Sequence, residues 1–208
     1  MFARNPPDNS RDVAAALLCA EAFHAHAQPF IKRLGEEGIK RPVEITEELG
    51  QLVACATNLA LALEMYLKTL LTLLAIAVPQ THDLRVLYDA LPLTAVMDVL
   101  DRYAKGGSII FPLRASVTIA KGAPCEPPWK DYHEESTDLP EVLARSRDLF
   151  ISWRYIFEFT RPRHADHQLH EFEYALLNLA CFSLKHSILD HLGKDGGLQS
   201  VGRTDRSA

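Results

Sequence analysis

The chain has 208 residues, of which 48% are hydrophobic and 24% charged, and these fractions are ordinary for a soluble globular protein. They exclude collagen-like, disordered and disulfide-scaffold classes, and the length suits a single domain. The formal net charge of −5 gives no overall basic field that would attract nucleic acid, so a generic nucleic-acid coat protein is excluded while a local basic patch stays open.

Compartment and membrane association can be predicted from three features. The segment 1–11 has no unbroken apolar run, unlike a secretory signal. The apolar stretch 58–78 carries Glu64 and Lys68 at its centre, where charges are costly in lipid, so we predict a buried core helix there and no membrane contact. No C-x-x-C pair occurs among the four cysteines, which are Cys19, Cys55, Cys125 and Cys181. We therefore expect reduced, mostly buried thiols, a cytoplasmic location and no cofactor or metal.

The first half of the chain has the apolar spacing of α-helices. One helix is predicted over 11–34, where two glycines follow, and a second over 46–78, with Thr46 as N-cap and Pro79 as the stop. Leucines cover most of the circumference of the second helix, which indicates a central position. Two short helices follow, one opening near Leu84 with Thr81 as its N-cap and one over 93–105.

An irregular insert is predicted over 106–137, because its prolines forbid a long helix. Within it, 108–111 and 116–120 have the composition of short strands and could form a hairpin.

Two further long helices are predicted after the insert. Asp138 with Glu141 resembles a capping box and would begin a helix through about Phe159, and a last helix spans about 166–192. The expected fold is all-α: a four-to-six-helix up-and-down bundle over 1–195, with an irregular or short β-hairpin insert and a disordered tail over 196–208.

Two segments of this bundle resemble the HEPN superfamily. The first is Leu63-Glu64-Met65-Tyr66-Leu67-Lys68-Thr69-Leu70-Leu71, followed by Thr81-His82-Asp83-Leu84, and the second is Phe150-Ile151-Ser152-Trp153-Arg154-Tyr155-Ile156-Phe157-Glu158. With the helix order, the resemblance covers about 47–192, apart from the insert. It implies a symmetric homodimer and, in catalytic members, metal-independent RNA cleavage by an arginine and a histidine four to six residues further on, at the dimer interface.

The chain departs from that catalytic pattern. No histidine follows Arg154 at the required gap, so the standard active site is absent there. Two other pairs satisfy the gap: Arg161 is followed after five residues by His167, and Arg163 after six residues by His170. Such spacings also arise by chance in a chain of this length, so they carry little weight.

Glu64, His82 and Arg154 are the central candidates for a functional cluster. A carboxylate in the most apolar helix needs a partner, which would be Lys68 or Arg154 in a structural interpretation. His82 could stabilise its turn or act in acid–base chemistry, and Arg154 could brace its aromatic neighbours or bind an anion. In the resemblance, the turn that carries His82 approaches the glutamate of the preceding helix, which implies that the three side chains share one polar cluster. The structural and functional interpretations both stay open.

Basic residues also gather between the last two predicted helices. The arginines Arg147, Arg154, Arg161 and Arg163, together with His164, are candidates for anion or RNA binding, because a helix start and nearby guanidinium groups favour anions. The histidines His164, His167 and His170 are spaced by threes, which spreads them too widely over a helix to predict a metal site.

Three functions follow from these patterns. The leading one is a HEPN-like dimer that binds RNA or a nucleotide-like anion, in a bacterial defence or toxin–antitoxin context. The second is a non-catalytic interaction module that dimerises or binds a cognate protein. The third is a metal-independent endoribonuclease, for which the catalytic candidates are Arg154, His82, Glu64, Arg161 and His167.

Overall fold

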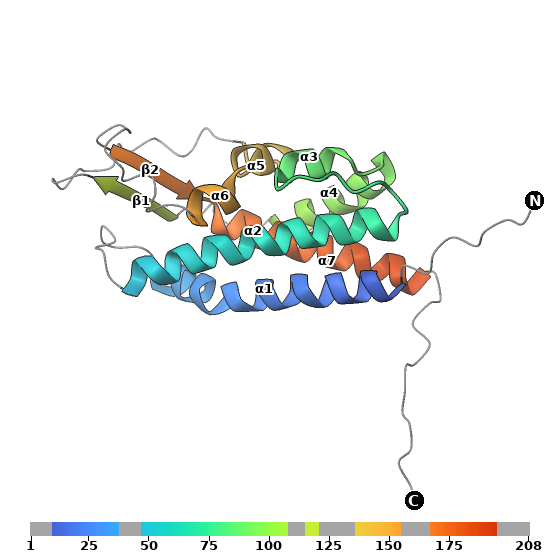
Figure 1. Cartoon of the computed structure of the whole chain (residues 1–208), viewed down its shortest axis with the longest axis horizontal. Helices are drawn as coiled ribbons and strands as arrows, with labels where there is room; N and C mark the ends of the chain where they lie inside the picture. Colours follow the sequence, from blue (N-terminus) through green and yellow to red (C-terminus); the bar gives the residue numbers. More distant parts are fainter. Residues whose placement is uncertain (1–9, 38–46, 108–114, 121–135, 155–166, 195–208) are drawn as a thin grey trace, which may run out of the picture.

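The computed structural model describes residues 10–37, 47–107, 115–120, 136–154 and 167–194. Three long helices lie side by side: α1 (Ser10–Glu37), α2 (Glu47–Leu73) and α7 (Tyr174–Lys194). Helix α1 runs opposite to α2 and α7, and α2 is the helix that also contacts the short helices above it (Figure 1). The helical bundle and the central second helix are as predicted.

Helix α2 is buried on nearly all sides, and Leu63 and Leu67 are fully enclosed. It ends at Leu73, before the predicted end near Val78. Ala75 adopts a left-handed backbone with a φ of 55°, and the N–H of Ile76 bonds the carbonyl of Leu71 at 2.9 Å. This is a Schellman-type ending, which satisfies the last carbonyls without the proline that was predicted to stop the helix.

Two short helices follow α2, as the sequence predicts: α3 (Leu84–Asp89) and α4 (Leu93–Gly107). The N-cap of α3 is Asp83, whose carboxylate accepts hydrogen bonds from the first backbone N–H groups of the helix, so the assignment of this role to Thr81 is wrong. The Thr81 hydroxyl instead accepts a bond from the Asp83 N–H at 3.0 Å and fixes the turn before the cap.

The single helix predicted over 138–159 is wrong, because the chain forms α5 (Leu139–Arg145) and α6 (Leu149–Arg154) with a turn between them. The N-cap of α5 is Asp138, but its side chain makes no capping bond, so the predicted capping box is absent. Breaking the helix lets α6 set Trp153, 1% exposed, into the core. The residues that would continue it to 159 lie outside the described part of the chain.

The last predicted helix begins later than expected. Residues His167–Phe172 form β2, which pairs antiparallel with β1 (Ala115–Ala120) so that Ala115 lies opposite Phe172. This two-stranded sheet lies at one end of the bundle, beside α6 (Figure 1). The strand at 116–120 is as predicted, and it pairs with a strand that is distant in the sequence. The other half of the predicted hairpin, 108–111, and the tail 196–208 lie outside the described residues.

Candidate functional site

A buried carboxylate on α2 holds two basic side chains. Glu64, whose side chain is 7% exposed, accepts a hydrogen bond from Lys68 Nζ on one oxygen at 2.6 Å and lies 2.9 Å from His82 Nδ1 with the other. Because a carboxylate only accepts hydrogen bonds, Nδ1 of His82 carries the proton in this contact. The imidazole is 56% exposed, so its anchored edge faces the protein while the ring reaches solvent.

The local fold brings these three side chains together. Lys68 lies one helical turn after Glu64, which places both on one face of α2. His82 lies in the turn before α3, between the Thr81 hydroxyl and the Asp83 cap, and these two contacts fix the backbone on either side of it. The predicted partnership of Glu64 with Lys68 and His82 is confirmed.

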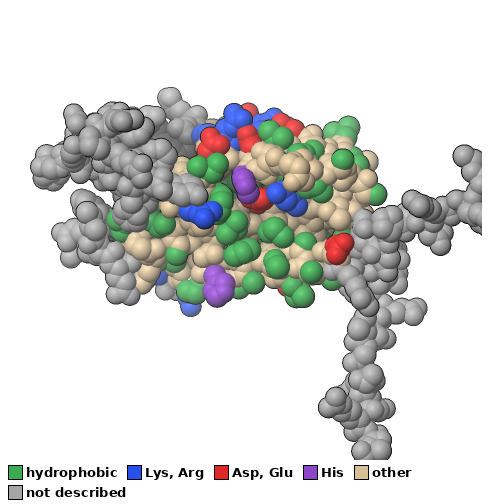
Figure 2. Space-filling view, viewed as in Figure 1, with side chains coloured by type: hydrophobic (Ala, Val, Ile, Leu, Met, Phe, Trp, Pro, Cys, Tyr) green, Lys and Arg blue, Asp and Glu red, His purple; other side chains and the backbone are tan. Residues whose placement is uncertain are grey.

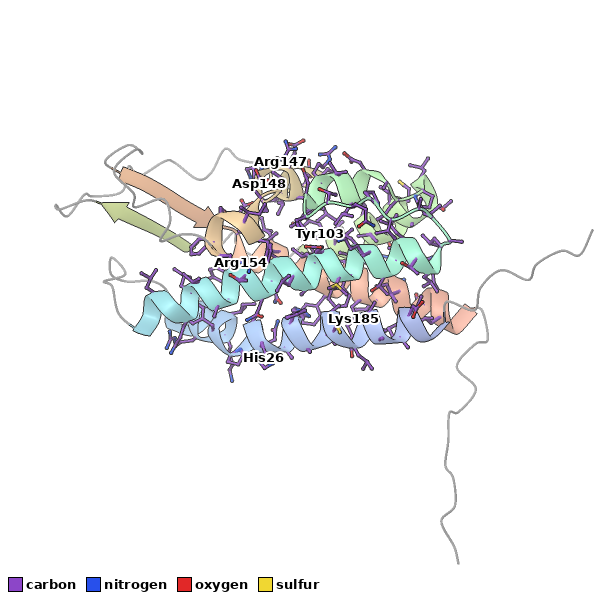
Figure 3. All side chains as sticks on the ribbon, in the orientation of Figure 1. His26, Tyr103, Arg147, Asp148, Arg154 and Lys185 are labelled. Atoms are coloured by element: carbon purple, nitrogen blue, oxygen red, sulfur yellow. The ribbon has the colours of Figure 1, made fainter. Side chains whose placement is uncertain are left out.

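Helix α6 adds an aromatic ring and a guanidinium group to the same place. The ring of Phe150 lies 5.5 Å from that of His82, centre to centre, and the Arg154 guanidinium carbon lies 5.4 Å from the centre of the Phe150 ring. Arg154 is at the end of α6 that borders α2 (Figure 3). We call Glu64, Lys68, His82, Phe150 and Arg154 the Glu64 site.

The surface around the Glu64 site has few other charges in the view of Figure 2. There a histidine lies beside acidic atoms near the middle of the face, with basic side chains on either side and uncharged surface around them (Figure 2). A second group of charged side chains lies apart from it, toward the upper edge of the view. In this view, the charged side chains of the described residues near the site form a group apart from that second one.

Arg147, a predicted anion ligand, lies against the α3 cap instead of the Glu64 site. Its Nε and Nη2 donate to Asp83 Oδ2 at 2.9 Å and 2.5 Å. Burial alone raises the pKa of the Asp83 carboxyl, but the hydrogen bonds from Arg147 and from the start of α3 outweigh it and hold this pKa below its usual value. Arg147 therefore ties the turn that carries His82 to the α5–α6 connection.

For the remaining candidates, the described part of the chain gives a backbone position or none at all. Arg161, Arg163 and His164 lie outside the described residues, so their predicted roles stay predictions. The backbone of His167 belongs to β2, as does that of His170, so the interpretation of both as part of a helix start is wrong. That interpretation failed because pairing with β1 satisfies the backbone here, which a local pattern does not reveal.

Sequence reasoning missed the roles of Phe150 and Asp83. Phe150 lies between His82 and Arg154. Its contact with Arg154 spans one turn of α6, but its contact with His82 joins elements that are far apart in the sequence, which no spacing could have indicated. The role of Asp83 had a signal, because an aspartate directly before the first apolar residue of a short helix is a favoured N-cap.

Within the described residues, one stretch, Leu49–Leu73, is long and apolar enough to cross a membrane, and 56% of its most apolar window is buried inside the bundle. The core helix of a soluble protein passes the same test, so the stretch is weak evidence for a span. In the same part of the chain, no three His, Cys, Asp or Glu side chains gather closely enough to hold a metal ion. No family model, curated protein or solved structure matches this chain.

Proposed function

We propose that the protein binds a phosphate group of RNA, or of a nucleotide-like anion, at the Glu64 site. The observation that carries the proposal is the anchoring of His82 by a buried carboxylate. Glu64 holds Nδ1, so the Nε2 edge of an exposed imidazole is the one available to a ligand. A histidine fixed in this way can meet a phosphate oxygen without first losing the freedom of a mobile side chain.

The charges around His82 support an anionic ligand. Lys68 and Arg154 bring two positive charges to one small area, and the Glu64 oxygens are already engaged by Lys68 and His82. The guanidinium group stacked on Phe150 is planar and can donate two parallel hydrogen bonds to a phosphate, a geometry that a lysine cannot provide. Glu64 is therefore a positioning residue, and the ligand contacts the cationic groups of Lys68 and Arg154.

Membership of the HEPN superfamily is part of this proposal. It rests on the glutamate-bearing helix followed by the Thr81-His82-Asp83-Leu84 turn, and the contact between Glu64 and His82 supports a common role for the two segments. A dimeric state, a defence or toxin–antitoxin role and a cognate protein partner belong to the same proposal.

A second candidate, metal-independent RNA cleavage, is favoured by the same hydrogen bond. A histidine with one nitrogen held by a carboxylate can accept a proton from a ribose hydroxyl or return one to the leaving oxygen through its other nitrogen. In this version His82 is the acid–base group and Arg154 stabilises the phosphate charge. A non-catalytic interaction module, in which the cluster only braces α2 against α3, is the alternative that both proposals must exclude.

Binding can be tested with fluorescently labelled single-stranded RNA, by anisotropy at low salt. We expect Arg154→Ala and His82→Ala each to weaken binding about tenfold, because a hydrogen bond to a charged group contributes about 1.5–3 kcal/mol. The matched control is Lys105→Ala, which removes an exposed cation of α4 that pairs with its neighbour Asp101.

The outcomes separate the three functions. RNA affinity that is unchanged in Arg154→Ala and His82→Ala, with a lowered melting temperature, would show that the cluster is structural. Gel analysis of the same RNA after incubation with EDTA tests cleavage. Products that appear with the wild type and disappear with His82→Ala support the endoribonuclease. Intact RNA in every lane indicates that the protein does not cleave RNA, and binding then remains the proposed function.

A further inference from the structure

Helix α1 presents an apolar face that nothing covers in the described part of the chain. Its inner side packs on α2 and α7, while its outer side is exposed from Asp12 to Lys32. The exposed uncharged residues of this side are Ala14, Ala15, Leu18, Cys19, Ala22, Ala25, His26 and Pro29. Leu18 is 66% exposed, and Figure 3 shows His26 pointing away from the bundle. We call this surface the α1 face.

An exposed aromatic of α7 lies beside α1. Phe182 is among the exposed large hydrophobic side chains, and its ring lies 4.8 Å from the ring of His24, which is buried on α1. Leu189 is exposed as well and lies seven residues further along α7, which puts it on the same side of that helix. Exposed apolar side chains therefore occur on both of these adjacent helices.

We propose that the α1 face binds the α1 face of a second copy of this chain, with the two α1 helices antiparallel around a two-fold axis at Ala22. The positions 15, 18, 22, 25 and 29 follow the alternating spacing of three and four that coiled-coil contacts use. With 19 and 26 they form a set that is symmetric about Ala22, so an antiparallel copy puts Ala15 opposite Pro29 and Cys19 opposite Ala25. A closed two-fold interface requires this kind of self-complementary patch.

Charge supports the antiparallel orientation. Among the described residues of α1, the exposed acidic and basic side chains are Asp12 near one end and Lys32 near the other. Both lie ten residues from Ala22, so in the antiparallel pair the Asp12 of each copy comes beside the Lys32 of the other. The two-fold axis makes two such pairs. A parallel pair would instead put like charges together, which is unfavourable.

The small side chains favour a second helix over a bulkier partner. Alanines at the centre of a helix face let another helix approach to the short end of the usual range of about 8–10 Å between helix axes. Leu18 then packs beside the partner's His26. The dimeric state belongs to the proposed function, and this inference adds the surface that forms it. The α1 face and the Glu64 site lie on different sides of α2 (Figure 1).

Sedimentation velocity from 1 to 100 µM tests the interface. We expect a dimer for the wild type and a dissociation constant higher by about tenfold or more for Ala22→Glu, which puts two like charges at the two-fold axis. The matched control is Ala104→Glu, at an exposed alanine of α4 away from the α1 face, and it should leave the dimer intact. A monomeric wild type, or a dimer equally stable in Ala22→Glu, would overturn the proposal.

A disulfide experiment tests the orientation separately. In a Cys125→Ser background, the change Ala25→Cys should let Cys19 of each copy bond the new thiol of the other under mild oxidation, giving a covalent dimer on a non-reducing gel. Disulfides need Cα atoms within about 7 Å, which the antiparallel register provides between these two positions. Cross-linking of the background protein through Cys19 alone, or the absence of a covalent dimer with Ala25→Cys, would refute the antiparallel arrangement.

Discussion

Replacing Glu64 by glutamine tests the claim that a buried carboxylate positions His82. In the wild type, both carboxylate oxygens accept hydrogen bonds, one from Lys68 and one from His82 Nδ1. An ammonium group can only donate, so the single oxygen of the new amide side chain should stay with Lys68 and its amide nitrogen should face His82. Nδ1 must then accept a hydrogen bond, and the proton of the neutral imidazole moves to Nε2.

The structure sets the scale of the expected destabilisation. The variant keeps one hydrogen bond to an ammonium group, exchanges a charge-assisted bond for a neutral one and removes a charge beside a cation that is itself partly buried. Hydrogen bonds to charged groups contribute about 1.5–3 kcal/mol and neutral ones about 1 kcal/mol, so we expect a loss of about 1–2 kcal/mol in the free energy of unfolding. For a chain of this size that corresponds to a fall of about 2–8 °C in melting temperature.

Two measurements check this reasoning. The nitrogen chemical shifts of the His82 ring report which nitrogen carries the proton, and they should exchange between the wild type and Glu64→Gln. Calorimetry gives the melting temperature, and Asp101→Asn is a control in which an exposed partner of a lysine is neutralised instead. If the ring keeps its proton on Nδ1 in Glu64→Gln, or if the melting temperature does not change, Glu64 does not position His82.

Three further predictions concern the core. Trp153→Ala should cost about 3–5 kcal/mol in urea unfolding, because it leaves a cavity where a fully buried indole packed. Arg145→Ala should cost about 1–3 kcal/mol by the same measurement, because Arg145 bonds both oxygens of the nearly buried Glu173 carboxylate at 3.0 Å; Arg145→Lys should recover only part of the loss. Burial lowers the pKa of His24 despite its hydrogen bond with Asn178, so the unfolded chain binds the proton more tightly. Stability should therefore fall as the pH drops below about 6.5, and His24→Gln should flatten that dependence; a flat wild-type profile would contradict the reasoning.

The long helices could be predicted from the sequence because their apolar pattern is repeated over many turns. The stripe of leucines in α2 is long enough to outweigh any local signal, and its nearly continuous apolar surface correctly indicated a central position. The end of α2 was predicted too late. Its Schellman ending uses Ala75 in place of the usual glycine, so the first recognisable stop signal in the sequence was Pro79.

The errors after residue 138 have a common physical cause. The segment of α5 and α6 has helical composition throughout, but the bundle needs a bend there to bring Trp153 inward, and only the packing of other elements decides that. Likewise, β2 has no strong strand pattern of its own and depends on β1, which is far away in the sequence. Short-range patterns cannot contain either piece of information.

The candidate site was predictable where its contacts are local and not where they are tertiary. Glu64 and Lys68 are one helical turn apart, and a carboxylate in an apolar helix needs a partner, so this pair was one of the two that the sequence predicted, the other being Glu64 with Arg154. The contribution of Phe150 did not, because it comes from packing α6 beside the turn that carries His82. The resemblance to HEPN segments supplied the link between Glu64 and His82 that spacing could not.

The positions of the two proposed surfaces have a functional consequence. In the HEPN pattern the catalytic groups meet at the dimer interface, so the site is complete only in the dimer. Here the α1 face lies on a different side of α2 from the Glu64 site (Figure 1). Ala22→Glu should therefore give a monomer that binds RNA with wild-type affinity, and Arg154→Ala a dimer that does not. A loss of RNA binding in the Ala22→Glu monomer would mean that the partner completes the site, which would contradict the independence of the two surfaces.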